Sequence, residues 1–462
     1  MENENNVSVN EVGTVGAVRS TGAVNRSEAE VKSASKTPTV AKKSVRNSDM
    51  NFVLISVGQG GWKISRTLAD CLPNNPFCIA VNTSNQDLDL TDLPDNQRFK
   101  IGGVHANGAG QNRNRAKLYY KNFSAENNYE ERMDVIKTFI SLYEEVIFNP
   151  EKQNVVIVSF TADGGSGSGI GPMFTTALTN YVNSVKNFMF DGKTYEIDDA
   201  TNIVPRPVVI GLVPKCRIAE GSGKLENNIE CFLDIQKAID HKLGHFFIAD
   251  NNLDESVKYN NTEEMYNIIN ARIAAPLMKF LGIEMNSDIK CMDLQDKVNA
   301  LRISGASSFI SVEPKGLFQY CVPHGQSITR VISMLKLDPT DPESQSHIEK
   351  KAKDTLKEID CISLDNTNAF FEVDRSALEG IGSITKELLE TSMLALIGYK
   401  SLGSIIEDLK YQSHKVIEAN DKKHSIIKEN ATGFDSIESD SKELSSRFGS
   451  NTMDQSAIND LF

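Results

Sequence analysis

The segment that decides the fold is Thr161-Ala162-Asp163-Gly164-Gly165-Ser166-Gly167-Ser168-Gly169-Ile170-Gly171. It follows the apolar run 154–160, which is typical of a strand buried on both faces, and it precedes the stretch 171–185, which predicts an amphipathic helix. Glycines let the backbone pass close to a bulky anion, and the helix behind them adds the positive end of its dipole. The segment therefore predicts a phosphate-binding loop rather than a flexible glycine–serine turn.

The same succession of strand and helix recurs on both sides of this segment. Apolar runs predict further strands at 51–57, 77–81, 208–213 and 246–249, and a glycine turn followed by a helix at 63–71, with another helix at 132–148. Strands that alternate with helices indicate right-handed β-α-β units and a parallel sheet covered on both faces. The fold class is therefore α/β, and the polar residues 187–205 predict a surface excursion.

A long helix is predicted over residues 262–281, with Asn261 or Thr262 as its N-cap and Gly282 after its end. Beyond it, strands at 307–312, 328–335 and 369–373 and a helix near 383–410 indicate a smaller α+β domain. Residues 1–48 contain no aromatic residue and residues 413–462 are polar, so both ends are predicted to be flexible tails. The predicted domains are thus a nucleotide-binding domain over 49–261, a central helix over 262–284 and a C-terminal domain over 285–412.

Composition excludes several classes of protein. The chain has 462 residues, 40% hydrophobic and 24% charged, and a formal net charge of -13, which argues against direct binding of nucleic acid through bulk electrostatics. Its 7 cysteines include no C-x-x-C pair and no paired histidine spacing, so neither a disulfide framework nor a structural metal site is predicted. The sequence shows no signal peptide and no apolar run of the roughly 20 residues that span a membrane, so a cytoplasmic protein is expected.

Two familiar phosphate-binding motifs fit poorly. The nearest match to a P-loop is Gly221-Ser222-Gly223-Lys224, which lacks the first glycine and is followed by Leu225. The dinucleotide-binding fingerprint would require a third glycine after Gly58-Gln59-Gly60-Gly61, and that glycine is missing. A dinucleotide-dependent oxidoreductase is therefore disfavoured.

The glycine loops, taken together and in order, resemble those of the tubulin/FtsZ family. The family signature G-G-G-T-G-[ST]-G is met by residues 163–169, with Asp163 in place of the first glycine. Residues 58–61 are similar to the family's first glycine loop, 81–86 to its A-N-T-D-x-Q loop, and Gly108-Ala109-Gly110-Gln111-Asn112 to the G-A-G-x-N loop that meets the γ-phosphate. Residues 213–221 resemble the loop whose Glu contacts the ribose, and the run 219–227 resembles the plasmid-segregation branch called TubZ. The resemblance covers about residues 50–300.

This resemblance implies that the chain binds GTP or GDP together with Mg²⁺. The nucleotide-binding residues that it implies are Gly58, Gln59, Gly60, Gly61, Asn82, Thr83, Gly108, Ala109, Gly110, Asn112, Gly164, Gly165, Ser166, Gly167, Ser168, Gly169, Glu220 and Lys224.

Recognition of the base is assigned to the long helix. Tyr266 and Asn270 lie one turn apart on one face, where a ring can stack on a base and an amide can pair with guanine. The family places an aromatic residue and an Asn or Asp at this spacing. Asn267 is a rival for the amide, and the alternative for Tyr266 is a core residue.

Two acids after the long helix are the catalytic candidates. Asp293 and Asp296, in Met292-Asp293-Leu294-Gln295-Asp296-Lys297, are explained by their position alone as helix caps. In FtsZ the corresponding loop carries N-x-D-x-x-D, and its acids reach the nucleotide of the neighbouring subunit. The resemblance therefore implies that Asp293 and Asp296 polarise the attacking water across a filament contact.

The expected function is a GTPase that polymerises head to tail into filaments for plasmid or phage DNA segregation or positioning. A C-terminal tail that binds a DNA-bound adaptor or another protein fits this reading. The alternatives are an FtsZ-type division protein and a structural relative that binds nucleotide without hydrolysing it, which Asp163 keeps open. Arg113 and Arg115 either approach phosphates or lie on a solvated helix face, and Trp62 is expected to serve packing.

Overall fold

The computed structural model describes residues 50–72, 75–103, 106–125, 128–197, 199, 204–216, 221–251, 258–281, 294–313, 316–319, 328–336, 343–359, 366–371 and 392–431. Contacts divide the chain into Met1–Lys42 and Lys43–Phe462, and every described residue belongs to the second unit. The predicted tail 1–48 therefore lies outside the described residues, as does the end of the chain from residue 432.

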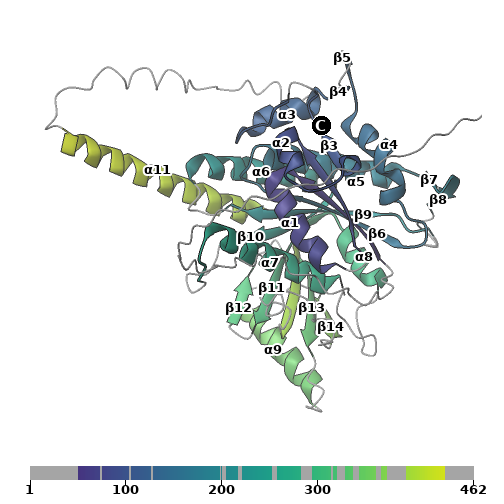
Figure 1. Cartoon of the computed structure of the whole chain (residues 1–462). Coiled ribbons are helices and arrows are strands. Elements are labelled where there is room, and N and C mark those ends of the chain that lie inside the picture. Colours follow the sequence, from purple (N-terminus) through teal and green to yellow (C-terminus); the bar gives the residue numbers. More distant parts are fainter. Residues whose placement is uncertain are drawn as a thin grey trace, which may run out of the picture. The chain divides into compact units, whose positions relative to one another are not determined.

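Strands and helices alternate along the described chain (Figure 1). The strands are β1 (Met50–Val57), β2 (Phe77–Asn82), β3 (Arg98–Lys100), β4 (Ser124–Ala125), β5 (Asn128–Arg132), β6 (Gln153–Phe160), β7 (Asn187–Phe190), β8 (Lys193–Glu196), β9 (Val208–Lys215), β10 (His245–Asp250), β11 (Gly305–Glu313), β12 (Gly316–Gln319), β13 (Ile328–Lys336), β14 (Asn366–Phe371) and β15 (Met393–Tyr399). The helices are α1 (Gly58–Cys71), α2 (Asn85–Asp89), α3 (Arg113–Lys121), α4 (Val135–Ile147), α5 (Ser166–Ser184), α6 (Ser222–Asp240), α7 (Thr262–Phe280), α8 (Leu294–Arg302), α9 (Ser344–Glu358) and α11 (Gly403–Ala431), with the 3-10 turn η1 (Asp95–Gln97).

One large sheet organises these elements, and it confirms the predicted α/β class. Its strand order is β14-β13-β15-β11-β10-β9-β6-β1-β2-β3, with β12 paired to β11. The strands from β3 to β11 are parallel, whereas β15 runs antiparallel to both β11 and β13. The sheet continues from β10 into β11, so the regions predicted as separate nucleotide-binding and C-terminal domains share it.

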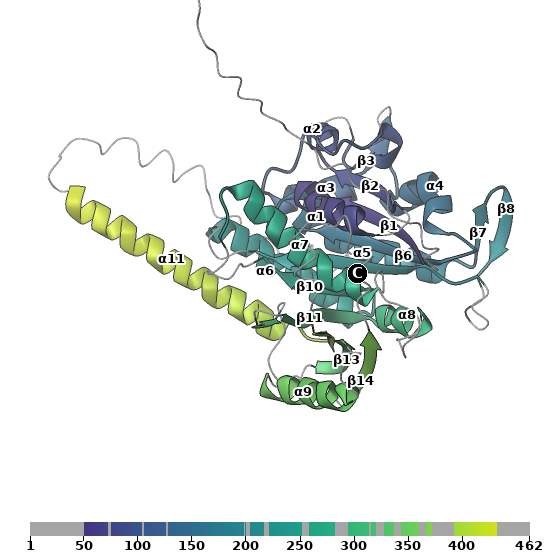
Figure 2. The ribbon, with the colours of Figure 1, turned by 60° about the horizontal axis from the view of Figure 1, so that its bottom comes forward.

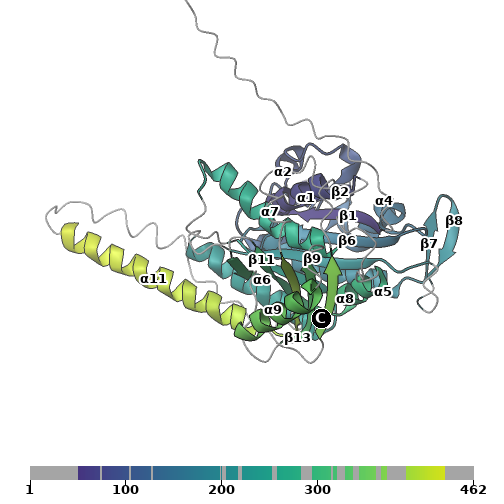
Figure 3. The same cartoon turned by 90° about the horizontal axis from the view of Figure 1, so that it is seen from below.

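Alternate residues of the central strands enter two different cores. On β1, Val53, Ile55 and Val57 belong to the core that includes α4, α5 and α6, while Phe52 and Leu54 belong to the core that includes α1, α7 and α8. A strand buried on both faces needs apolar side chains at consecutive positions, which is why these strands read as continuous apolar runs. On the second face α7 lies along α1 (Figures 2 and 3).

The winding of the parallel strands reverses at the carboxyl end of β1. From β1 the chain passes through α1 to β2 on one side, and it later returns through α4 to β6 on the other side. In open parallel sheets, ligands bind where the winding reverses in this way, outside the carboxyl ends of the strands. The glycine segments after β1 and β6 flank this reversal.

Two helices begin earlier than predicted. The first glycines were expected to form a turn before a helix at residue 63, and the helix after β6 was expected from residue 171. Instead α1 begins at Gly58 and α5 at Ser166, so both glycine segments contribute the first turns of helices. Glycine is a weak helix former inside a helix, but it leaves the N–H groups of a first turn accessible.

The C-terminal prediction was partly wrong. Residues 393–399, expected within a helix, form β15, because pairing to β11 and β13 on both sides outweighs the local preference of this apolar run. The predicted start of the C-terminal tail at residue 413 is also corrected, because α11 continues to Ala431. Helix-forming Lys, Glu and Ala are frequent in this extension, which favours continuation of the helix.

Other predictions agree with the described chain. The predicted excursion 187–205 contains the hairpin of β7 and β8. Asn261 is the N-cap of α7, because its Oδ1 accepts a hydrogen bond from the backbone N–H of Glu264 at 2.9 Å. Within the described ranges, no helix combines the length and hydropathy required to cross a bilayer.

Candidate functional site

Three long helices begin at the carboxyl edge of the sheet without a side-chain cap. The residues before α1, α5 and α6 are Val57, Gly165 and Gly221; none makes a capping hydrogen bond through its side chain, and no acidic residue lies in the three first turns. By contrast, α2, α3 and α4 are capped by the side chains of Ser84, Asn112 and Asp134. Helix α9, which packs on β13, also lacks a side-chain cap.

An uncapped helix start leaves backbone N–H groups without an intrahelical partner and carries the positive end of the helix dipole. Three such starts at one edge form an environment that favours a polyanion. The arrangement suits a chain of phosphates better than a single carboxylate, because the donors are spread over three elements.

The glycine segments lie in direct contact, and their lack of side chains permits this. Gly58 has φ +76°, and a Cβ on it would lie 3.0 Å from the backbone nitrogen of Gly167. A Cβ on Gly165 would lie 3.0 Å from the carbonyl oxygen of Gly110. The segments 58–61, 108–112 and 163–169, predicted separately from the sequence, are thus brought together.

The loop after β2 joins the same group. The hydroxyls of Thr83 and Ser166 lie 2.8 Å apart and hydrogen bond, and the N–H of Gly108 donates to the Thr83 carbonyl oxygen at 3.0 Å. Asn82 is turned toward its own segment, since its Oδ1 accepts from the Thr83 N–H at 2.7 Å and its Nδ2 donates to Asp87 at 3.3 Å. Thr83 therefore faces the glycine segments, whereas Asn82 shapes the loop.

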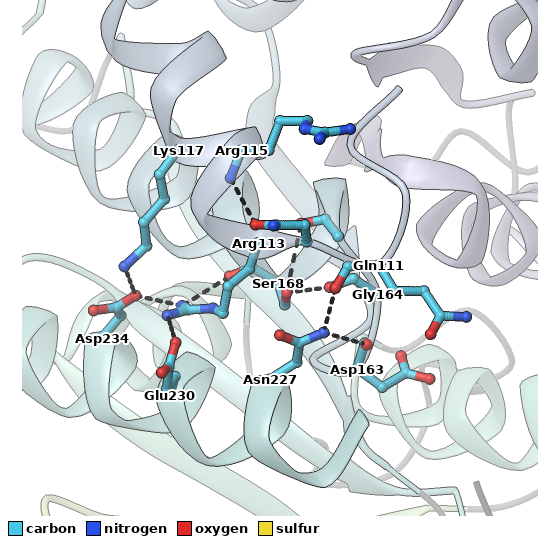
Figure 4. Close-up of polar contacts among 12 residues, drawn as sticks. Gln111, Arg113, Arg115, Lys117, Asp163, Gly164, Ser168, Asn227, Glu230 and Asp234 are labelled. Carbon is cyan, nitrogen blue, oxygen red and sulfur yellow. Dashed lines mark hydrogen bonds and ion pairs between the residues drawn. The ribbon is translucent and has the colours of Figure 1, made fainter. Parts of the chain in front are cut away.

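Helix α6 holds two of these segments at once (Figure 4). The Nδ2 of Asn227 donates to the carbonyl oxygen of Gln111 at 2.8 Å and to that of Asp163 at 3.1 Å. Sequence reasoning quoted Asn227 within the run 219–227 but gave it no role. The available signal was its position three residues after Lys224, on the helix that follows β9.

The glycine segment carries one carboxylate, and it is paired. Asp163 Oδ2 lies 3.6 Å from Lys224 Nζ, with side-chain exposures of 14% and 26%. The first-position Asp thus contacts a cation that the sequence predicted as a phosphate ligand.

Arg113 has a different place from both alternatives considered. It is buried rather than solvated, and it is paired with Glu230 and Asp234 of α6. Its guanidinium contacts the glycine segment 163–169 only through the carbonyl oxygen of Ser168. Arg115 is exposed, and Trp62 packs against the core that includes α1 and α7, as expected.

The predicted base-reading residues lie on α7, which packs along α1. Tyr266 of α7 is half-buried, and the Nζ of Lys63 on α1 lies 5.4 Å from the centre of its ring. Asn270 is buried one turn later, and Asn267 is exposed. Packing of α7 along α1 therefore brings the aromatic candidate near the start of α1.

The ribose-binding candidate Glu220 and the two catalytic candidates are only partly described. Glu220 and Asp293 lie outside the described residues, while Asp296 lies exposed in the first turn of α8. At the other end of α8, Arg302 donates to the carbonyl oxygen of Arg206, just before β9, at 2.8 Å. Helix α8 therefore extends to the sheet edge opposite the glycine segments.

The oxygen donors at this edge of the sheet suit Mg²⁺ only in partnership with a nucleotide. Among the residues that the structure describes, no group of three or more His, Cys, Asp and Glu could hold a metal by itself. Mg²⁺ at nucleotide sites is usually held by substrate phosphates, waters and one or two protein oxygens. The carboxylate of Asp163 and the hydroxyls of Thr83 and Ser166 fit that mode of binding.

Solved structures with similar folds were found, although no protein-family model and no curated protein matches the sequence. A GTPγS-form protofilament of TubZ from Bacillus thuringiensis serovar israelensis has a TM-score of 0.56 and 14% identity, covering 83% of this chain and 96% of that one. A two-stranded filament of TubZ-Bt gives a TM-score of 0.58 at 13% identity, with 86% and 96% covered. The GDP-bound monomer of CetZ1 from Haloferax volcanii gives 0.52 at 17% identity, with 80% and 100% covered.

Proposed function

Because the chain has the tubulin-like fold of TubZ and CetZ, we propose that it binds GTP and GDP at the carboxyl edge of the sheet. The observation that carries this proposal is the convergence of three uncapped helix starts with the glycine segments after β1 and β6. The GTPγS and GDP named with the TubZ and CetZ1 structures are consistent with it.

The phosphates would lie against the first turns of α1 and α5. Backbone N–H groups of the segments 58–61 and 164–169 would donate to them, and residues 108–112 would close the site from the side of α3. Lys224 would reach the phosphates from α6, leaving Asp163. The Thr83 and Ser166 hydroxyls would fix the spacing between two loops.

Base recognition is proposed for α7. Tyr266 would stack on the guanine and Asn270 would read its edge, with Asn267 as the alternative amide. Glu220 would contact the ribose.

Hydrolysis is proposed to require a second subunit. Asp293 and Asp296 would orient the attacking water at the nucleotide of the neighbouring molecule in a head-to-tail filament. The exposure of Asp296 in the first turn of α8 is consistent with this division, because an exposed acid can reach a neighbouring subunit. Bound Mg²⁺ would neutralise phosphate charge.

The cellular role that fits this chemistry is a cytoplasmic filament that segregates or positions plasmid or phage DNA. The C-terminal tail would contact a DNA-bound adaptor or another protein, without direct binding of nucleic acid by the acidic chain. An FtsZ-type division protein would share the nucleotide chemistry and differ in the partner of the tail.

Light scattering and phosphate release, measured together, test this function. GTP should induce assembly followed by phosphate release, and GTPγS should induce assembly that persists. The double variant Asp293→Ala/Asp296→Ala should assemble with GTP but release phosphate at least tenfold more slowly. The control Asp354→Ala removes an exposed acid of α9 and should match the parent.

Each alternative has its own outcome in this experiment. Assembly without phosphate release by the parent would indicate a structural relative that does not hydrolyse GTP. Absence of assembly with either nucleotide would refute the filament proposal, and an unchanged rate in the double variant would remove the two acids from catalysis.

A further inference from the structure

A buried guanidinium lies directly behind the 108–112 loop. Arg113 is the first residue of α3, immediately after that loop (Figure 4). Its side chain is only 4% exposed. Its Nη1 donates to Glu230 at 2.7 Å, and its Nη2 donates to Asp234 at 2.5 Å. Both acids belong to α6, so this one side chain joins the end of the loop to a second helix.

The charges in this cluster are matched. Lys117, one turn after Arg113, contacts Asp234 at 2.6 Å, so two cations face two carboxylates. Burial alone would raise the pKa of Asp234, but Arg113 and Lys117 hold it below its usual value. The cluster is therefore ionised near neutral pH, and a buried ion pair that loses one partner leaves an uncompensated charge.

Arg113 also satisfies a backbone group that the glycine helix leaves open. In a regular helix the Ser168 carbonyl oxygen would accept from the N–H of residue 172, but residue 172 is proline and has none. The Nη2 of Arg113 donates to this carbonyl oxygen at 3.2 Å. A single guanidinium thus links the loop, the first turns of α5 and one face of α6.

The backbone is closely packed around Arg113 and the 108–112 loop. A Cβ on Gly169 would lie 2.5 Å from the Arg113 carbonyl oxygen, so the start of α3 rests on α5. On the other side of the loop, Asn227 donates to the carbonyl oxygen of Gln111. The loop is held from α6 at two points, one on each side of Asn112.

We propose that Arg113 is a positioning residue that holds the 108–112 loop at the depth needed by the terminal phosphate, and so makes the site prefer a nucleoside triphosphate to a diphosphate. The inference rests on the proposed nucleotide site. In the proposed site the 108–112 loop would meet the terminal phosphate, which only the triphosphate carries. A loosened loop would then weaken triphosphate binding, while diphosphate binding at the 58–61 and 163–169 segments would persist.

Lysine cannot replace Arg113 fully. Its ammonium is a point charge, whereas the planar guanidinium presents separate donors to Glu230, Asp234 and the Ser168 carbonyl oxygen at once. Arg113→Lys should keep the pairing with one carboxylate and lose the fixed geometry. Arg113→Lys is therefore less destabilising than a variant that removes the charge.

The test is calorimetric titration of the full chain with GTPγS and with GDP. The ratio of the GDP to the GTPγS dissociation constant should fall about tenfold in Arg113→Met and about threefold in Arg113→Lys. Lys121→Met, at the exposed far end of the same helix, should leave the ratio within twofold of the parent. If Arg113→Met does not fold, Arg113→Lys decides.

Two failures can be told apart. A parent chain that binds neither nucleotide contradicts the proposed function itself. A parent that binds both, with Arg113 variants that lose affinity equally for both or keep the parental ratio, overturns only the role of Arg113.

Discussion

Removing the charge of Asp163 should strengthen nucleotide binding. Asp163 occupies the first position of the glycine signature, where the family has glycine, and its carboxylate lies 3.6 Å from Lys224. If Lys224 serves the phosphates, it must first leave this carboxylate. The variant Asp163→Asn keeps the side-chain volume and the backbone carbonyl that accepts from Asn227.

The size of the effect follows from the geometry. Two unit charges at 3.6 Å attract by about 1 kcal/mol in water and by about 5 kcal/mol at an effective dielectric constant near 20. The pair is mostly buried, with side-chain exposures of 14% and 26%. Desolvation of both ions and lost side-chain freedom offset most of the attraction, which leaves a net value of about 1 kcal/mol. In Asp163→Asn, Lys224 no longer has to leave a carboxylate, and a saving of about 1 kcal/mol corresponds to about fivefold tighter binding of GTPγS.

Titration calorimetry at constant ionic strength, with and without Mg²⁺, measures this change. We expect Asp163→Asn to bind GTPγS about fivefold more tightly without Mg²⁺, and by a smaller factor with it, because the cation offsets the same carboxylate. Asp191→Asn removes an exposed charge from the turn between β7 and β8 and serves as the control. Weaker or unchanged binding in Asp163→Asn would refute the competition for Lys224.

Three further predictions concern other parts of the chain. Gly58→Ala should lower the free energy of unfolding in urea by about 1–2 kcal/mol, because the alanine must keep φ +76° and its Cβ would lie 3.0 Å from Gly167. The control Gly223→Ala, whose Cβ meets no atom within 4 Å, should cause no loss, and equal stabilities of the two variants would contradict the packed glycine contact. Burial lowers the pKa of His245 from 6.5 to about 4. As the pH falls, the unfolded chain is protonated at this residue before the folded chain, so the free energy of unfolding should fall by about 3 kcal/mol from pH 6.5 to 4. His245→Phe should flatten this part of the pH profile, and an unchanged profile would show that His245 is not the cause. Tyr266→Ala should weaken GDP binding about tenfold and Tyr266→Phe less than twofold in calorimetry, since the ring supplies the stacking; equal losses would point to its hydroxyl.

The sequence was most informative where local pattern and tertiary environment coincide. The apolar runs of β1 and β6 predict strands buried on both faces, and the glycines that follow them favour a close backbone contact over a flexible turn. These runs also indicated the parallel sheet, because they alternate with helices. The order of the glycine segments then pointed to one site at one edge.

Long-range partners were beyond the reach of the sequence. Arg113 pairs with Glu230 and Asp234, which lie 117 and 121 positions further along the chain. Nothing near Arg113 in the sequence therefore distinguishes a buried anchor from a solvated helix residue. The hydrogen bond between the hydroxyls of Thr83 and Ser166 spans 83 positions. β15 was misassigned for the same reason, since its apolar residues become a strand only through neighbours on both sides.

The most direct test of the whole account is the affinity of the purified chain for guanine and adenine nucleotides. Titration with GTPγS, GDP and ATPγS should give one saturable site per chain for the two guanine nucleotides and at least tenfold weaker binding of ATPγS. Absence of saturable binding by GTPγS and GDP, or equal binding of ATPγS, would contradict a guanine nucleotide site at the carboxyl edge of the sheet.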